Sequence, residues 1–153
     1  MVFKNRRELI DFLCDKAYNA LRNAQTVVYD IIQDYLQQFY ADYDPVLYNR
    51  TEQLLRSLVK GDIRASADGF VADIYFDLSS LNYATGNNPT GEQVMKAAAQ
   101  GLHGAIGSNL LYVDPTISGG TGVSVWNDPL NVLDAEAIRI LRDRLVEEGI
   151  PIK

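Results

Sequence analysis

The first part of the chain has the hydrophobic pattern of one long amphipathic helix. Apolar residues recur every three or four positions from Leu9 to Phe39, so they form a single stripe, and most charged residues fall on other faces. Asn5 is a suitable N-cap, and Glu8 completes a capping-box-like pattern three positions later. We therefore predict a helix over about residues 5–41, roughly 50 Å long at 1.5 Å per residue.

A shorter helix is expected next. Pro45 cannot continue the first helix, and Asp44 before it can cap a second one with the proline at its first position. Leu55 and Leu58 continue a partial apolar stripe, and Gly61 would close this helical region.

Residues 70–78 carry the strongest strand signal in the sequence. Apolar side chains alternate there with a second set that includes two aspartates, which predicts a strand with one buried face. Residues 62–67 are expected to pair with it as a hairpin, and Asp68-Gly69 is a typical two-residue turn.

A third helix and one more strand are predicted after a loop rich in Asn, Gly and Pro. Thr90 and Gln93 form a capping-box pattern, and Gly101 would end the helix. The Gly-rich chain that follows has no clear period, and residues 122–127 look like a strand.

A last helix closes the predicted fold. Asp134 is a suitable N-cap, and Gly149 stands where a C-terminal glycine belongs. The expected fold class is α+β: a long N-terminal helix with a small, mostly antiparallel sheet packed against helices. We expect one domain over 1–153, with the long helix at about 5–41 and the sheet and other helices within 44–153.

Composition and charge exclude several functions. The 153 residues carry a formal net charge of −6, and the basic residues are not clustered, which argues against a nucleic-acid partner. No segment is long and apolar enough for a membrane helix, and the charged N-terminus lacks the apolar core of a signal peptide. We expect a cytoplasmic protein with no membrane partner.

Residues that could support catalysis are few. The sequence has one cysteine, Cys14, which we expect to be a small apolar group in the long helix, and one histidine, His103, in a Gly-Leu-His-Gly context that suits a turn. Asp73 and Asp77 fall on the solvent face of the predicted strand, and neither they nor Asp42 and Asp44 have an EF-hand spacing.

The remaining motifs add no chemistry. The Gly-rich run 118–122 lacks the lysine of a phosphate-binding loop, and the dinucleotide-binding pattern is absent. We therefore predict no enzyme activity, no catalytic residue, no metal site and no cofactor.

Tyrosines gather near the end of the long helix and the turn after it. Such residues are enriched at protein–protein contacts because they combine apolar area with a polar tip, although they equally suit a role in sealing the core around Pro45. Our candidate residues for an assembly interface combine some of these tyrosines with apolar residues of the last third: Tyr40, Tyr43, Tyr48, Leu110, Tyr112 and Trp126.

The segment from Tyr43 to Ser57 follows the pattern Y-x-P-x-x-Y-x-R-T-x-x-L-x-x-S. It resembles small proteins of phage and prophage structural gene clusters that are similar to the tail-completion, or neck, proteins of long-tailed phages. The T-G-E-Q-V segment from Thr90, the His-Gly pair at 103–104, Trp126 and the final G-I-P-I are also similar to that group. The family's Pro-Thr-Gly signature is not intact, because Glu52 follows Thr51.

The resemblance implies a non-enzymatic structural subunit at the phage head–tail junction. It implies a homo-oligomeric ring, other head–tail proteins as partners, and a location in the host cytoplasm during assembly and then in the virion. Two other classes remain open: a small acidic phage-encoded inhibitor that binds a host protein, and a hydrolase that uses carboxylates with a metal ion.

The Gly-rich segment 101–122 carries one further hypothesis. Its glycines favour a mobile backbone, whereas residues such as Leu110, Tyr112 and Ile117 are too apolar for a permanently solvated linker. We expect this segment to become ordered against a neighbouring subunit. The alternative is that residues 110–113 form an ordinary strand and the glycines serve tight turns.

Overall fold

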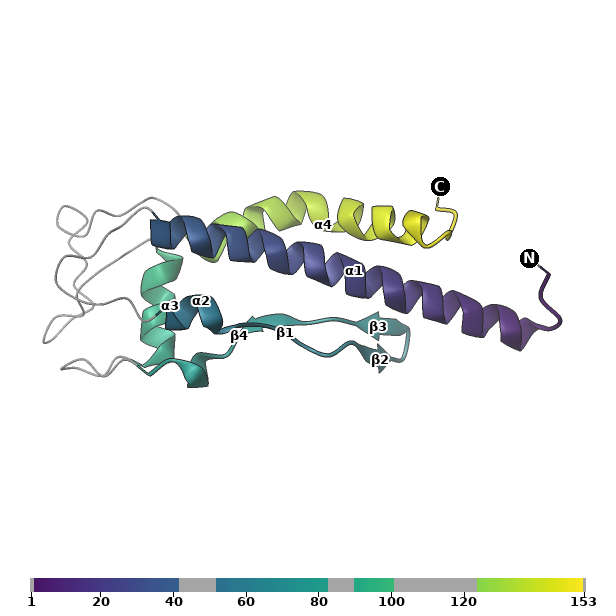
Figure 1. The fold of residues 1–153 in the computed structure, drawn as a ribbon, viewed down its shortest axis with the longest axis horizontal. Coiled ribbons are helices and arrows are strands. Elements are labelled where there is room, and N and C mark those ends of the chain that lie inside the picture. The colour runs from purple at the N-terminus through teal and green to yellow at the C-terminus, as the bar shows by residue number, and fades with distance from the viewer. Residues whose placement is uncertain (1, 42–51, 83–89, 101–123, 153) are drawn as a thin grey trace, which may run out of the picture.

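Two long antiparallel helices and a narrow β-ribbon make up most of the computed structural model (Figure 1). The structure describes residues 2–41, 52–82, 90–100 and 124–152. Helix α1 (Arg6–Ala41) lies in the middle, with α4 (Asn127–Glu147) along one side and the ribbon along the other. The fold is α+β and mostly helical, as predicted.

Helix α1 confirms the predicted long helix. The Asn5 side chain accepts a hydrogen bond from the Glu8 backbone N–H at 2.9 Å, and the Glu8 carboxylate accepts one from the Lys4 backbone N–H at 2.8 Å. Ala20 and Ala24 are buried, as are larger residues nearer the C-terminal end of α1, including Leu36. The small alanines allow α4 to approach α1 closely.

The ribbon contains the predicted hairpin in interrupted form. Strand β1 (Leu58–Lys60) pairs antiparallel with β4 (Ile74–Phe76), and β2 (Arg64–Ser66) pairs with β3 (Gly69–Val71). Residues 70–78 are therefore two short strands followed by the 3₁₀ helix η1 (Leu78–Ser80), not one continuous strand.

The hairpin turn lies one residue earlier than predicted. Ser66 pairs with Gly69, so the two loop residues are Ala67 and Asp68. Gly69 opens β3 with a φ of 149°, a backbone conformation that favours glycine. The glycine therefore serves the first position of the strand and not the turn itself.

The second predicted helix ends earlier than expected. Helix α2 covers Gln53–Arg56, and the segment before residue 52 lies outside the described residues. The Ser57 hydroxyl donates to the Leu54 carbonyl oxygen at 2.8 Å and closes the turn. Leu58, predicted to be helical, instead begins β1 with its side chain in the core, so Gly61 does not end a helix.

Helix α3 (Gly91–Ala99) confirms the predicted capping box. The Thr90 hydroxyl accepts from the Gln93 backbone N–H, and the Gln93 side chain accepts from the Thr90 backbone N–H at 2.9 Å. A Cβ atom at Gly91 would meet the backbone carbonyl of Leu78, so glycine is required for α3 to pack on η1. The predicted end at Gly101 lies just outside the described residues.

Helix α4 begins earlier than predicted. Asn127 is its first residue, so Asp134 lies inside the helix and is not its N-cap, and residues 124–126 are not part of a strand. Pro129 is tolerated because it lies in the first turn, where a backbone N–H has no helical partner. At the other end Gly149 has a φ of 84° and lies in a C-terminal cap in which Ile150 N–H donates to Leu145 O, as predicted.

The core runs between α1, α4 and the start of the ribbon. Leu36 and Val125 are fully buried, and Leu54 is nearly so. Phe76 and Ile74 of β4 pack against the same cluster from the ribbon side. The core therefore joins elements from both ends of the sequence, and α1 is its central support.

Candidate interaction groove

An apolar groove opens between α1, α4 and the ribbon. Its volume is about 340 Å³, and among the described residues that line it Gln25 is the one polar side chain. Helix α1 forms the floor, α4 forms one wall, and Ala72 and Ile74 of the ribbon contribute to the other. The groove is lined by Leu21, Ala24, Gln25, Val28, Ile32, Ala72, Ile74, Trp126, Pro129, Leu130, Leu133, Ala137 and Leu141.

Gln25 fixes the ribbon wall relative to the floor. This side chain is 8% exposed, and its Nε2 donates to the carbonyl oxygens of Gly61 at 2.8 Å and Asp73 at 2.9 Å. Gly61 N–H also donates to the Asp73 carbonyl oxygen at 2.8 Å. The three bonds hold the ribbon at the interruption that separates the β1–β4 pair from the β2–β3 pair. This role cannot be predicted from the sequence, because a glutamine on a long helix is ordinarily a surface residue.

Trp126 lies at the end of the groove where α4 begins. Its ring packs at 5.9 Å from that of Phe76 and is 38% exposed. Just before it, the Ser124 hydroxyl donates to Ala99 O and accepts from the backbone N–H groups of Trp126 at 3.3 Å and Asn127 at 2.9 Å. Ser124 therefore ties the start of α4 to the end of α3 and holds Trp126 in place.

The α4 wall leaves large apolar side chains accessible. Leu130 and Leu141 are 39% and 36% exposed, although both line the groove. Ile138, 84% exposed, lies on the same helix one turn from Leu141 and beside Ala137. An apolar surface therefore extends from the groove over the outer edge of α4.

Two of the predicted interface residues can be placed. Trp126 lines the groove, whereas the Tyr40 side chain is half-buried, its ring lies 5.8 Å from that of Phe39, and it packs against the core. That position suits the alternative in which tyrosines seal the core. Four other candidates lie outside the described residues: Tyr43, Tyr48, Leu110 and Tyr112.

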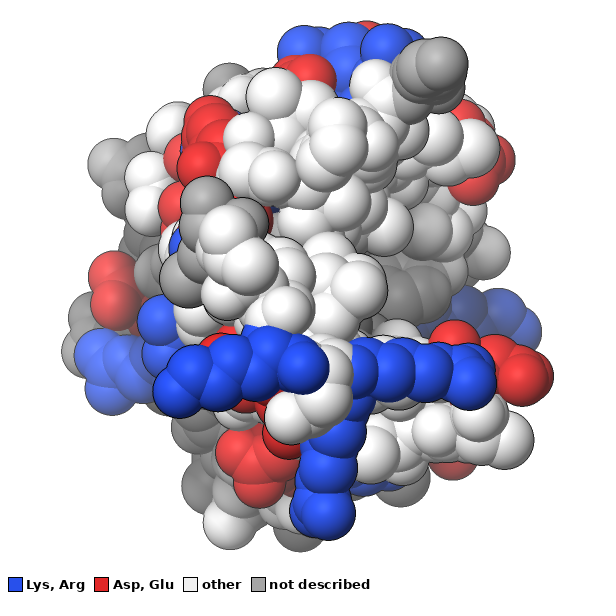
Figure 2. Space-filling model, turned by 90° about the vertical axis from the view of Figure 1, so that its right-hand side faces the viewer, with Lys and Arg blue, Asp and Glu red and all other residues white. Residues whose placement is uncertain are grey.

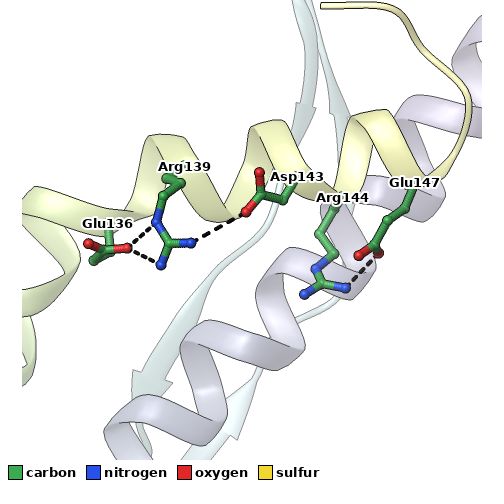
Figure 3. A network of polar contacts seen from close by, with 5 residues as sticks. All are labelled: Glu136, Arg139, Asp143, Arg144 and Glu147. Atoms are coloured by element: carbon green, nitrogen blue, oxygen red, sulfur yellow. Dashed lines mark hydrogen bonds and ion pairs between the residues drawn. The ribbon is translucent and has the colours of Figure 1, made fainter.

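The charged residues of α4 are largely paired with one another. Arg139 lies between Glu136 and Asp143, and Arg144 pairs with Glu147 at 2.5 Å (Figure 3). These pairs are solvent-exposed and each contributes about 0–1 kcal/mol to stability. Their main effect is that this part of α4 does not present a uniformly acidic face.

The residues considered for catalysis or metal binding do not cluster within the described parts of the chain. Asp73 pairs with Arg64, and Asp77 caps η1 by accepting from Ser79 N–H at 3.1 Å. Cys14 is exposed on α1 and not packed as an apolar residue, while His103, Asp42 and Asp44 lie outside the described residues. Across the described ranges, no group of three His, Cys, Asp or Glu side chains could hold a metal ion. Nor does any helix in the described parts have the length and hydrophobicity to cross a membrane.

The chemistry of the groove suits the binding of apolar side chains.

Comparison with known proteins places the chain in a family. Neither a curated protein nor a solved structure matches it. The model of the YomN family matches residues 5–140, which include α1, the ribbon, α3 and most of α4. The chain therefore belongs to the YomN family, a family associated with phages and prophages.

Proposed function

We propose that this protein is a non-enzymatic structural or assembly protein of the phage particle, acting in a ring at the head–tail junction as a tail-completion or neck protein. The observation that carries the proposal is the open apolar groove with Trp126 at one end, in a chain of a phage-associated family. A groove of this chemistry binds protein segments through buried apolar area.

Contact residues of this kind suit assembly. Tryptophan is enriched where protein contacts contribute most to affinity. The Trp126 backbone is held by Ser124, and its ring packs against that of Phe76. Leu130, Ile138 and Leu141 extend the accessible apolar area beyond the groove itself. Large exposed apolar surfaces rimmed by polar residues typically mark interaction sites.

The acidic-inhibitor alternative receives less support. A protein that mimics nucleic acid needs carboxylates gathered on one face without compensating cations. In this structure Glu136, Asp143 and Glu147 are each paired with an arginine (Figure 3). Glu148, beyond them, contacts Lys16 at 2.9 Å.

Deleting the gene from an inducible phage or prophage that carries it tests the proposal. We expect filled heads and separate tails in electron micrographs, with joined particles restored by the gene supplied in trans. Purified wild-type virions should contain the protein by mass spectrometry. Normal joined particles from the deletion strain, or virions lacking the protein, would contradict a head–tail role and would favour an inhibitor.

A matched pair of variants separates groove function from folding. Leu130→Asp places a charge on the exposed groove wall, whereas Val146→Asp places one at an exposed apolar position near the other end of α4. We expect only the first to fail in restoring joined particles, while both remain folded by circular dichroism.

A further inference from the structure

The amino-terminal end of α1 projects beyond the elements that flank the rest of the helix (Figure 1). The C-terminal end of α4 meets α1 at Lys16, which contacts Glu148, and the hairpin end of the ribbon meets it at Tyr18, whose ring lies 5.7 Å from that of Phe70. Residues 6–15, called the α1 arm below, extend past both. The arm carries apolar side chains that are 37%, 45% and 41% exposed: Leu9, Ile10 and Leu13.

The apolar face of the α1 arm continues directly into the floor of the groove. Steps of four and three residues lead from Ile10 through Cys14 and Ala17 to Leu21, and then to Ala24 and Val28. The last three of these residues line the groove. This spacing is the one by which two helices pack along a common seam, so one partner helix can contact the whole line.

The arm and the groove also match in length. Ten residues of α1 span about 15 Å, and the groove floor from Leu21 to Ile32 spans about 17 Å. Both surfaces are apolar. The arm is exposed, and the groove is accessible at Leu21 and Val28 of its floor and at Leu130 and Leu141 of its wall, while Ala24 and Ile32 lie buried at its base. We propose that the α1 arm of one copy occupies the groove of a second copy in an antiparallel, two-fold dimer.

The two copies can exchange arms, because the α1 arm and the groove floor lie on the same face of α1. When the arm of the first copy enters the groove of the second, the antiparallel arrangement brings the arm of the second copy onto the groove of the first. The contact is then isologous and joins two chains, so the ring proposed above would need a second contact between such dimers. The inference does not rest on the proposed function, because such a dimer would form whether or not the protein joins a phage particle.

Charges at the two ends of the seam complement one another. Arg6 and Arg7 are exposed at the start of the arm, and Figure 2 shows Lys and Arg side chains across the middle of the end face on which α1 begins. Asp134 is exposed on α4. Within the described part of the chain, none of the three forms an ion pair.

The register of α4 along α1 allows these charges to meet. Because Lys16 contacts Glu148 and the helices are antiparallel, Asp134 lies level with about residue 30 of α1. A two-fold axis that crosses α1 near residue 18 then brings Arg6 and Arg7 of one copy beside Asp134 of the other. It also leaves the two Cys14 residues about 12 Å apart along the seam, which is too far for a disulfide bond between them.

Sedimentation equilibrium of the full chain, with reductant present, is the first test. We expect a mass that approaches twice the 17.1 kDa of one chain as concentration rises. Ile10→Gln with Leu13→Gln should leave a folded monomer, because both side chains are exposed in the single chain. Val146→Gln, an equally exposed apolar position outside the seam, should leave the dimer unchanged. A wild-type monomer at every concentration would overturn the proposal and leave the groove to a different protein, and so would a dimer that the double variant does not weaken.

A charge exchange tests the register of the dimer. Arg6→Glu with Arg7→Glu should raise the dimer dissociation constant about threefold to tenfold, since exposed ion pairs are weak and two sets are lost per dimer. Asp134→Arg alone should act in the same direction. Combining all three substitutions should return the constant close to the wild-type value. A combined variant that is weaker than either parent would overturn the antiparallel register.

Discussion

The side-chain Nε2 of Gln25 donates to the main-chain oxygen of Asp73 at 2.9 Å, which links the middle of α1 to the ribbon. The same amide group donates to Gly61 O at 2.8 Å. One buried side chain therefore contacts both segments of the ribbon at the point between the β1–β4 pair and the β2–β3 pair. The ribbon wall of the groove therefore depends on a polar contact with the helix that forms the floor.

Gln25→Ala should lower the free energy of unfolding by about 1–3 kcal/mol, because it leaves the Gly61 carbonyl oxygen without the Gln25 donor in a partly buried setting. Urea denaturation followed by circular dichroism measures the change as a shifted midpoint. Gln38→Ala, at an exposed position of the same helix, is the matched control and should change stability by less than about 0.5 kcal/mol. Equal effects of the two substitutions would show that the Gln25 contacts contribute little.

Gly91 is required where α3 packs on η1. Gly91→Ala should destabilise the protein by about 1–3 kcal/mol, because the added Cβ meets the Leu78 backbone carbonyl, which cannot rotate away as a flexible side chain would. Thermal unfolding checks this, with Glu92→Ala at the next, exposed position as the control. A stabilised Gly91→Ala variant, as helix propensity alone predicts, would contradict the close approach.

Ser124→Ala should loosen the start of α4 and the position of Trp126. The loss of its hydroxyl removes an acceptor for two backbone N–H groups and a donor to Ala99 O, at a cost of about 1–2 kcal/mol. The sequence has one tryptophan, so its fluorescence reports this site directly. We expect a red-shifted emission maximum, because the indole becomes more exposed to water. Ser80→Ala, in exposed η1, should leave the spectrum unchanged.

The sequence predicts the fold correctly where a pattern repeats over many residues or lies within a few neighbouring ones. The stripe from Leu9 to Phe39 repeats over many helical turns, and the Thr90 and Gln93 capping pattern is contained in four residues. The start of α4 was not predictable in this way. Its anchor is the contact of Ser124 with Ala99, which comes from a distant segment, and the alternation around Val125 favoured a strand locally.

The same distinction holds for the groove. Trp126 could be chosen from the sequence because aromatic residues are enriched at protein contacts, and in the structure it lines the groove. Gln25 was missed because its importance comes from two carbonyl groups that only the folded ribbon brings near it. Arg6, Arg7 and Asp134 likewise gain meaning only when the register of α4 along α1 is known.

The ion pair between Lys16 and Glu148 joins α1 to the end of α4 in that register, and its energy can be measured. The side chains are 32% and 19% exposed, so the pair is partly shielded from water at the end of α4. A double-mutant cycle with Lys16→Met and Glu148→Gln should give a coupling free energy of about 0.5–1 kcal/mol at low salt. This coupling should fall as ionic strength rises toward 1 M, where the Debye length is about 3 Å.

The matching cycle on α4 itself uses Arg144→Met and Glu147→Gln. That pair joins residues three positions apart on one helix, and should show a coupling of only about 0.2–0.5 kcal/mol. A Lys16–Glu148 coupling no larger than this value would mean that the pair does not hold the two helices in register. The level of Asp134 along α1 would then depend on apolar packing alone, through buried residues such as Leu133 and Ile140.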